Sequence, residues 1–370
     1  MDFRRRQLLR GGLAISTLAA IHPRPGRATD TESSFKPQPG AWRTFEIATQ
    51  IDLVAQRGVM QAWVPLPSIH ADDWIHPLGD EWQVSGGRAA ALRVGRYGVK
   101  LLHIHWPDGD RDISVRIVSR VATRDRAVDL ANPGGPAPLN AADRALFLRP
   151  TVLIPTDGIV RQTAYDIVAG AASDEEKAHL LYEWVVEHTS RNANTAGCGM
   201  GDIASMLTTG NLSGKCADLN ALFVGMARAC GMPARDLYGI RVAPSRFGFK
   251  SLGANSSLIS KAQHCRAEVY LAQWGWVPVD PSDVRKVVLE EPPGNLSLAD
   301  TKVEAARKTL FGAWEGNWIV YNAGHDVRLP GSTRPPLDFL MYPQAEAGGE
   351  LRDSLDPNTF KYVITTKQIV

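Results

Sequence analysis

The chain has 370 residues, of which 44% are hydrophobic and 22% charged, as is typical of a soluble globular protein. These values exclude a mostly disordered chain, a fibrous protein and a polytopic membrane protein, and the length suggests two or three domains. Residues 1–28 hold six arginines and one acid, which leaves 35 basic and 38 acidic residues in the remainder. A mildly acidic body argues against nucleic acid as a partner. Four cysteines are too few for a disulfide scaffold.

Residues 1–28 have the pattern of an export signal. A basic segment precedes the apolar run 11–21, which is too short to span a bilayer. The string Arg5-Arg6-Gln7-Leu8-Leu9-Arg10 resembles the twin-arginine signal of bacteria. The resemblance implies passage through the twin-arginine export machinery, cleavage near Ala28, and a periplasmic protein without stable membrane insertion. A disordered basic tail or an uncleaved anchor is the alternative.

Residues 40–130 predict a small antiparallel β-sandwich. Alternating apolar residues follow Phe45 to Leu53 and Ile113 to Ser119, and turn signals such as Gly86-Gly87 separate the runs. The proline- and glycine-rich segment 132–138 is then expected to be a linker or an exposed loop.

Residues 140–370 predict an α+β domain. Helices are expected at 159–170, 173–189 and 214–230, and Ser173 with Glu176 forms a capping-box pattern. Strands are expected at 235–242 and 263–280, followed by a short helix near 302–310 and a final strand over 361–369.

The segment 210–235 is the most informative for chemistry. Leu219, Leu222 and Met226 share a helical stripe, Ser213 is a plausible N-cap, and Gly231 marks the end. Cys216 therefore falls in the first turn, where the helix dipole and free N–H groups lower a thiol pKa and can stabilise an oxyanion. The alternative is a small residue packed at a helix start.

Two extended runs between residues 263 and 283 predict a hairpin. If Val277 and Val279 face the core, His264 and Asp280 emerge on the same side, although the sequence leaves the register open. A carboxylate beside an imidazole fixes its orientation, and the imidazole then activates a thiol. A polar hairpin face with Asp280 capping a helix before Pro281 is the alternative.

Together these blocks resemble the transglutaminase-like family, a branch of the papain-like cysteine enzymes. The resemblance rests on Gly214-Lys215-Cys216, the segment 227–235, His264, and the run 275–281, and it covers residues 140–285. It implies a papain-like or transglutaminase-like core of the α+β class behind the β-sandwich, with Cys216 as nucleophile, His264 as base and Asp280 as orienter.

The resemblance implies acyl transfer on peptide or amide bonds through a Cys216 thioester, with a protein or peptide substrate and no cofactor or metal. We expect hydrolysis, as by a cysteine peptidase or amidase. A protein-glutamine transamidase and a catalytically inactive periplasmic binding scaffold remain as alternatives.

Further residues are weaker candidates for the site. Asn211 is a candidate for the oxyanion hole and Trp276 for the cleft wall; the alternatives are a turn for Asn211, which its type and spacing favour, and core packing for Trp276. The glycine-rich segment 197–201 is expected to be a flexible edge of the cleft, with Cys198 as a candidate second thiol. Cys230 and Cys265 are expected to face the core.

Overall fold

The computed structural model describes residues 35–53, 58–108, 113–135 and 138–370. The twin-arginine signal expected in residues 1–28 lies outside this range. Within it, no helix combines the length and the apolar character needed to cross a membrane.

Two antiparallel sheets form the β-sandwich. One has the strand order β19-β1-β6-β3, and the other has the order β18-β17-β2-β5-β4. Their bounds are β1 Arg43–Leu53, β2 Met60–Pro65, β3 Ile75–Val84, β4 Arg88–Val94, β5 Val99–Trp106, β6 Ile113–Thr123, β17 Gln344–Ala347, β18 Glu350–Leu351 and β19 Tyr362–Gln368. Along β6, buried and more exposed residues alternate from Ile113 to Ser119, as the sequence pattern predicts.

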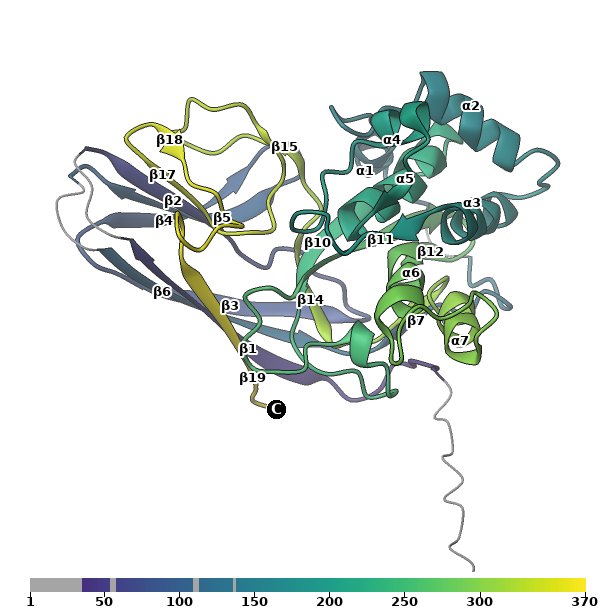
Figure 1. Ribbon diagram of the computed structural model, residues 1–370, viewed down its shortest axis with the longest axis horizontal. Coiled ribbons are helices and arrows are strands. Elements are labelled where there is room, and N and C mark those ends of the chain that lie inside the picture. The colour runs from purple at the N-terminus through teal and green to yellow at the C-terminus, as the bar shows by residue number, and fades with distance from the viewer. Residues whose placement is uncertain (1–34, 54–57, 109–112, 136–137) are drawn as a thin grey trace, which may run out of the picture. The chain divides into compact units, whose positions relative to one another are not determined.

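The C-terminal strands correct the expected domain boundary. β19 pairs with β1 from Ile51↔Tyr362 to Phe45↔Gln368, so yellow and purple strands lie side by side in Figure 1. β17 pairs with β2, and Phe360 is buried in the sandwich interior. Residues 344–368 therefore belong to the sandwich and not to the predicted 140–370 domain. The pattern of a strand indicates that it pairs but not with which partner.

The remainder is built on a third antiparallel sheet with the order β12-β11-β10-β14. Its strands are β10 Ala234–Arg241, β11 Gln263–Leu271, β12 Gly275–Val279 and β14 Trp318–Asn322. Short pairs are formed by β7 Arg126–Ala127 with β13 Ala313–Trp314, β8 Ser190–Arg191 with β9 Ser213–Gly214, and β15 His325–Val327 with β16 Leu337–Phe339.

The helices are α1 Ala141–Leu148, α2 Gly158–Ile167, α3 Asp174–His188, α4 Ile203–Thr209, α5 Cys216–Ala229, α6 Pro281–Glu290 and α7 Thr301–Thr309, with a 3₁₀ turn at Lys250–Leu252. α3 begins as predicted, because the Ser173 side chain accepts a hydrogen bond from the Glu176 N–H at 3.0 Å. The fold is of the mixed α+β class predicted from the sequence.

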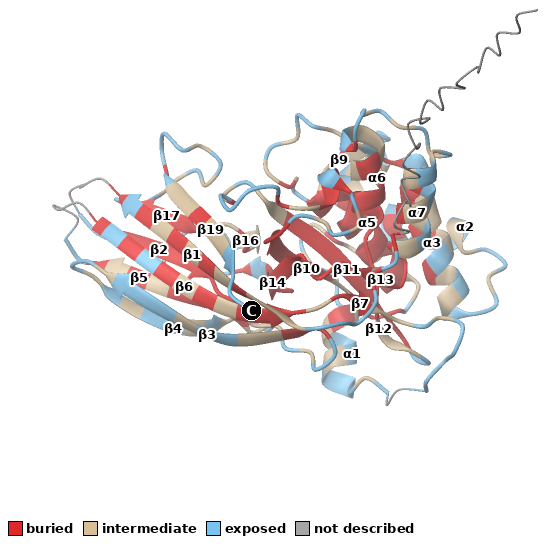
Figure 2. Cartoon of the chain, turned by 90° about the horizontal axis from the view of Figure 1, so that it is seen from below, coloured by how far each residue is buried: buried red, intermediate tan, exposed pale blue. Residues whose placement is uncertain are grey.

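α5 is the central helix of this part. Every residue from Cys216 to Arg228 is buried, and Figure 2 shows α5, β10 and β11 largely in red. Residues of β1 and β6, including Phe45 and Val121, share one core cluster with those of α5, β10 and β11. Most of α5 is thus held in the core, which fixes the position of Cys216 at its start.

Candidate active site

Cys216 is the first residue of α5, and its side chain lines a cavity of about 690 Å³. The N-cap is Lys215 and not the predicted Ser213, which lies in β9. The Lys215 N–H donates to Asp218 Oδ2 at 2.9 Å. Cys216 therefore has the position at a helix N-terminus that favours a thiolate.

The glycine-rich loop beside Cys216 is tied down by Asp218. Its Oδ1 accepts hydrogen bonds from the Met200 and Gly201 N–H groups, each at 2.9 Å. Gly199 has φ 94°, and a Cβ there would lie 1.8 Å from Asp218 Oδ2. Gly197 and Cys198 do line the cavity, as expected, but the loop is anchored where a flexible edge was predicted.

The register of the β11–β12 hairpin brings His264 and Asp280 together. Ala267 pairs with Val279, and Val269 pairs with Val277, so the valines share the face that packs on the core. Asp280 follows directly and its Oδ2 lies 2.8 Å from His264 Nε2. Asp280 both contacts His264 and caps a helix, the two roles that the sequence left open. Its Oδ1 accepts a hydrogen bond from the Asp283 N–H at 3.1 Å and so caps α6.

Three further residues that the sequence analysis did not assign to the site complete it. Asp283 Oδ2 lies 3.3 Å from His264 Nε2, and its Oδ1 accepts from Arg241 Nη2 at 2.6 Å. Asn220, one helical turn after Cys216, donates to Asp280 Oδ1 at 3.2 Å. The sequence signal that could have found Asp283 was its position three residues after Asp280, in the first turn of α6.

The electrostatics of these groups favour a thiolate–imidazolium pair. Burial lowers the pKa of His264, but Asp283 and Asp280 outweigh it and raise this pKa to about 9. Burial opposes ionisation of Cys216, yet hydrogen bonds from the Cys198 and Cys265 thiols and from His264 hold its pKa well below the usual value. Between these two pKa values, Cys216 is anionic and His264 is cationic.

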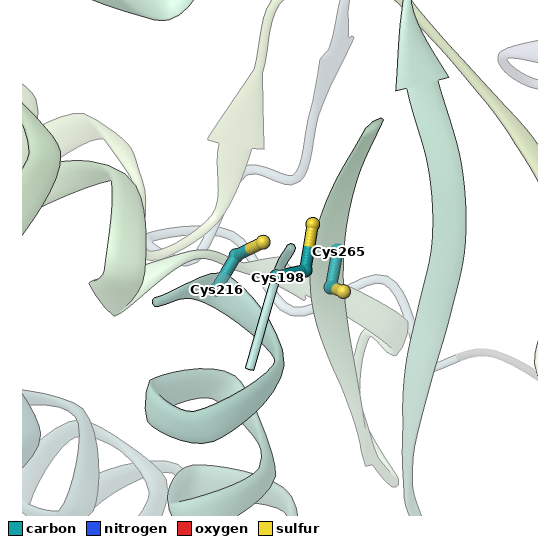
Figure 3. A group of neighbouring side chains, drawn as sticks. All are labelled: Cys198, Cys216 and Cys265. Carbon is teal, nitrogen blue, oxygen red and sulfur yellow. The ribbon is translucent and has the colours of Figure 1, made fainter. Parts of the chain in front are cut away.

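Three sulfur atoms gather at the start of α5. Figure 3 shows Cys216 from the helix near Cys198 from the glycine-rich loop and Cys265 from β11, and their Sγ atoms all lie within 4.8 Å of one another. Cys265 is fully buried, as predicted, yet its sulfur reaches the site because α5 packs across that face of β11. Cys230 lies at the other end of α5, half-buried; all four thiols are free.

Two predicted site residues lie elsewhere. Asn211 is exposed, its Oδ1 accepts from the Ser213 N–H and hydroxyl, and it does not line the cavity, so it is a turn residue. Trp276 shares the strand face of Asp280 but lies four residues away, about 13 Å along the strand. It packs against Phe147 and lies under the Arg235 guanidinium, so it does not form the cleft wall.

The comparisons with known proteins concern the domain that carries this site. Residues 161–281, which include Cys216, His264 and Asp280, match the Transglutaminase-like superfamily. The chain is 36% identical over 342 residues to an uncharacterized protein of Haemophilus influenzae, with 88% of this chain and 91% of that protein covered. Residues 161–281 therefore form a transglutaminase-like domain.

Two solved structures are similar to this chain to different degrees. A "putative cysteine protease" from Cytophaga hutchinsonii superposes with a TM-score of 0.50 at 16% identity, covering 89% of this chain and 99% of that one. The periplasmic domain of TgpA from Pseudomonas aeruginosa gives a TM-score of 0.34 at 15% identity, covering 70% of this chain and 75% of that one. The first likeness supports the α+β fold, and the family match identifies residues 161–281 as its transglutaminase-like core.

Proposed function

We propose that this protein is a thiol hydrolase that cleaves a peptide or amide bond of a protein or peptide substrate through a thioester on Cys216. The observation that carries the proposal is that Cys216 and His264 line one cavity and that Asp280 holds His264 from behind. The Cys216 thiol is held low in pKa beside His264, and His264 is bonded to Asp280 at 2.8 Å. The match of residues 161–281 to the transglutaminase-like superfamily supports cysteine-based chemistry, and the geometry of the site supports the particular reaction.

In the first half-reaction the Cys216 thiolate attacks the carbonyl carbon of the scissile bond. The His264 imidazolium then gives its proton to the departing nitrogen as the C–N bond breaks. The products are an amine and a thioester on Cys216. Asp280, fixed by Asn220 and Ser282, keeps the His264 ring in place during both proton transfers.

The oxyanion of the tetrahedral intermediate needs donors beside the sulfur. The first donor is the N–H of Cys216. It lies in the first turn of the helix, where a backbone N–H has no intrahelical carbonyl to donate to. The second donor is Gln263, whose Nε2 is buried without a hydrogen-bond partner in the described part of the chain. Gln263 lines the cavity. Its backbone carbonyl accepts a hydrogen bond from Cys198 Sγ at 3.4 Å, so the residue lies beside the thiols. Gln263 thus replaces Asn211 as the candidate side-chain donor.

In the second half-reaction neutral His264 removes a proton from water, which attacks the thioester and releases the carboxylic acid and Cys216. The lining of the cavity is mixed: serines, lysines and Asn255 contribute polar groups, and Tyr342, Phe360 and Tyr362 contribute aromatic rings. Trp274 and Trp276 lie outside it. The polar part of the wall supports water as the acceptor.

We propose that the protein acts in the periplasm and is exported by the twin-arginine machinery. This part of the proposal rests on the sequence of residues 1–28. Replacing Arg5 and Arg6 by lysine is expected to leave the precursor in the cytoplasm. Equal periplasmic yield of the double variant would show that another export route is used.

The experiment on the reaction uses water labelled with ¹⁸O and a labelled primary amine in competition, with a mixture of peptides as acyl donors. Hydrolysis places ¹⁸O in the new carboxyl group, whereas transamidation places the amine there. Alkylation by iodoacetamide, mapped by mass spectrometry, measures the reactivity of Cys216 with Cys230 as the internal control. An excess of amine product would make the protein a transamidase. Equal, slow alkylation of both cysteines would favour an inactive scaffold.

A further inference from the structure

The cavity that opens on Cys216 has a cationic wall. Its lining includes five basic side chains and no aspartate or glutamate among the described residues; the basic ones are Arg191, Lys215, Arg241, Lys261 and Lys286. The chain as a whole has 41 basic and 39 acidic residues, so this wall concentrates one sign of charge. Neutral polar groups, among them Asn255 and Ser256, and apolar and aromatic side chains, among them Leu258 and Phe360, make up the rest of the lining.

Carboxylates behind the wall compensate only part of this charge. Arg191 and Lys286 share the single carboxylate of Glu290, and Arg241 pairs with Asp283 at 2.6 Å. Burial and then the neighbouring Arg191 and Arg241 lower the pKa of Lys286, which indicates crowding of like charges.

The two remaining lysines have no acidic partner in the described part of the chain. Lys215 Nζ donates to the neutral carbonyl of Thr195 at 2.7 Å, and Lys261 is exposed at the cavity. Lys215 directly precedes Cys216, and Lys261 lies three residues before His264. One uncompensated charge therefore lies beside the strand that carries the base and one beside the nucleophile.

We infer that the cavity accepts an anionic acyl donor, a peptide with carboxylate side chains or a free carboxylate close to the scissile bond. The inference rests on the proposed function and names its substrate class. Carboxylates entering a partly enclosed cationic cavity form charge-assisted hydrogen bonds and are drawn in by the field of the wall. A basic peptide would be repelled by the same charges.

The test measures binding and not turnover, so it does not depend on the proposed reaction. The Cys216→Ala variant is titrated with length-matched peptides rich in Glu, Gln or Lys, each carrying a neutral dye, by fluorescence anisotropy. We expect the Glu peptide to bind about tenfold tighter than the Gln peptide, which is one step of 1.4 kcal/mol. The advantage should shrink as added salt screens the charges. Cys216→Ser serves if the alanine variant is unstable.

A charge reversal locates the effect. In the same background, Lys261→Glu should weaken binding of the Glu peptide by about tenfold. Lys308→Glu on α7 is the matched control, since Lys308 is exposed and does not line this cavity. Equal binding of Glu and Gln peptides, or equal losses in the two variants, would overturn the inference. If binding holds but wild-type protein releases no carboxylic acid, the proposed function fails and the binding site stands.

A second, independent observation is the group of three thiols in Figure 3. The Sγ atoms of Cys198, Cys216 and Cys265 lie within 4.8 Å of one another, and Met341 Sδ lies 4.0 Å from Cys265 Sγ. Thiolates around one tetrahedral Zn²⁺, each at about 2.3 Å, are roughly 3.8 Å apart. A small closure of these side chains would therefore provide three ligands to one ion. Cys198 and Cys216 line the cavity, which gives an entry path.

We propose that these three cysteines bind one thiophilic divalent cation, of the class of Zn²⁺ and Cd²⁺, which blocks the nucleophile reversibly. Cys216 binds as the thiolate it already is, while Cys198 and Cys265 each lose a proton to solvent as the ion enters. No electron is transferred. Soft sulfur ligands select such ions over Ca²⁺ or Mg²⁺.

The probe is Cd²⁺ alone, added to the reduced full chain and followed by the thiolate-to-cadmium absorbance in the ultraviolet. We expect one equivalent to bind and peptide cleavage to stop at the same stoichiometry. Cys198→Ser and Cys265→Ser should each remove about a third of the absorbance change and weaken binding. Cys230→Ser, at the other end of α5, is the matched control and should change neither. Wild-type affinity and absorbance in both Ser variants would overturn the proposal, as would an equal loss in Cys230→Ser.

Discussion

Replacing Asp283 by asparagine should shift the alkaline limit of activity downward. Asp283 is almost fully buried, and its Oδ2 lies 3.3 Å from His264 Nε2. It is the foremost of the groups that raise the pKa of His264 from 6.5 to about 9 against its burial. Asparagine has nearly the same shape, keeps the backbone N–H that donates to Asp280, and removes only the charge.

The size of the effect follows from the two carboxylates. The difference between 6.5 and about 9 corresponds to ~3 kcal/mol in favour of the imidazolium. Asp280 remains in the variant and keeps part of this stabilisation. Arg241 loses its carboxylate partner, so its charge repels the imidazolium more strongly. An opposite charge at this distance contributes about one to three pH units, so we expect the pKa to fall by about one to two. The imidazolium that protonates the leaving amine is lost as pH rises through this pKa, so kcat/KM should decline from a lower pH.

The assay is the pH dependence of kcat/KM for peptide cleavage, accompanied by NMR titration of the His264 ring. Asp166→Asn, an exposed change of the same charge on α2, is the control. Thermal unfolding verifies that the variant is folded. The stability of the fold should depend on pH in the same direction as the activity. A histidine whose pKa is raised by folding stabilises the fold at low pH, and this stabilisation disappears above about pH 9. An alkaline limit unchanged near pH 9 in folded Asp283→Asn would refute the argument.

Four other outcomes are expected. Cys216→Ala should abolish turnover with little change in Tm, measured by product release and calorimetry; a large loss of Tm would favour a packing role. Gln263→Ala should lower kcat by about 10²-fold, as for a lost oxyanion donor, whereas Asn211→Ala should leave kcat unchanged. Asp218→Asn should lower the free energy of unfolding in urea by about 1–3 kcal/mol, since the amide keeps one acceptor oxygen for the loop but turns an NH₂ group towards the Lys215 N–H that Oδ2 now accepts from. Phe360→Ala should cost about 3–5 kcal/mol in the same measurement, and a negligible cost would contradict its place in the sandwich core.

Local patterns in the sequence predicted several of the elements and offered Cys216, His264 and Asp280 as candidates, but they left the hairpin register open and did not predict α1, α4 or α6. The stripe of α5 and the position of Gly231 placed Cys216 in a first turn, because helical packing repeats within a few residues. Strand alternation placed His264 and Asp280 on one face, since neighbouring side chains point to opposite sides. These rules act between residues that are close along the chain.

Only the tertiary structure decided which distant segments meet. The pairing of β19 with β1 joins residues more than three hundred positions apart, and no periodicity encodes such a partner. Cys198 reaches Cys216 through a loop anchored by Asp218. Trp276 is on the predicted face but too far along its strand, since alternation determines a side and not a distance. The charge of the cavity is likewise a tertiary property, because its basic residues come from separate segments that only packing brings to one wall.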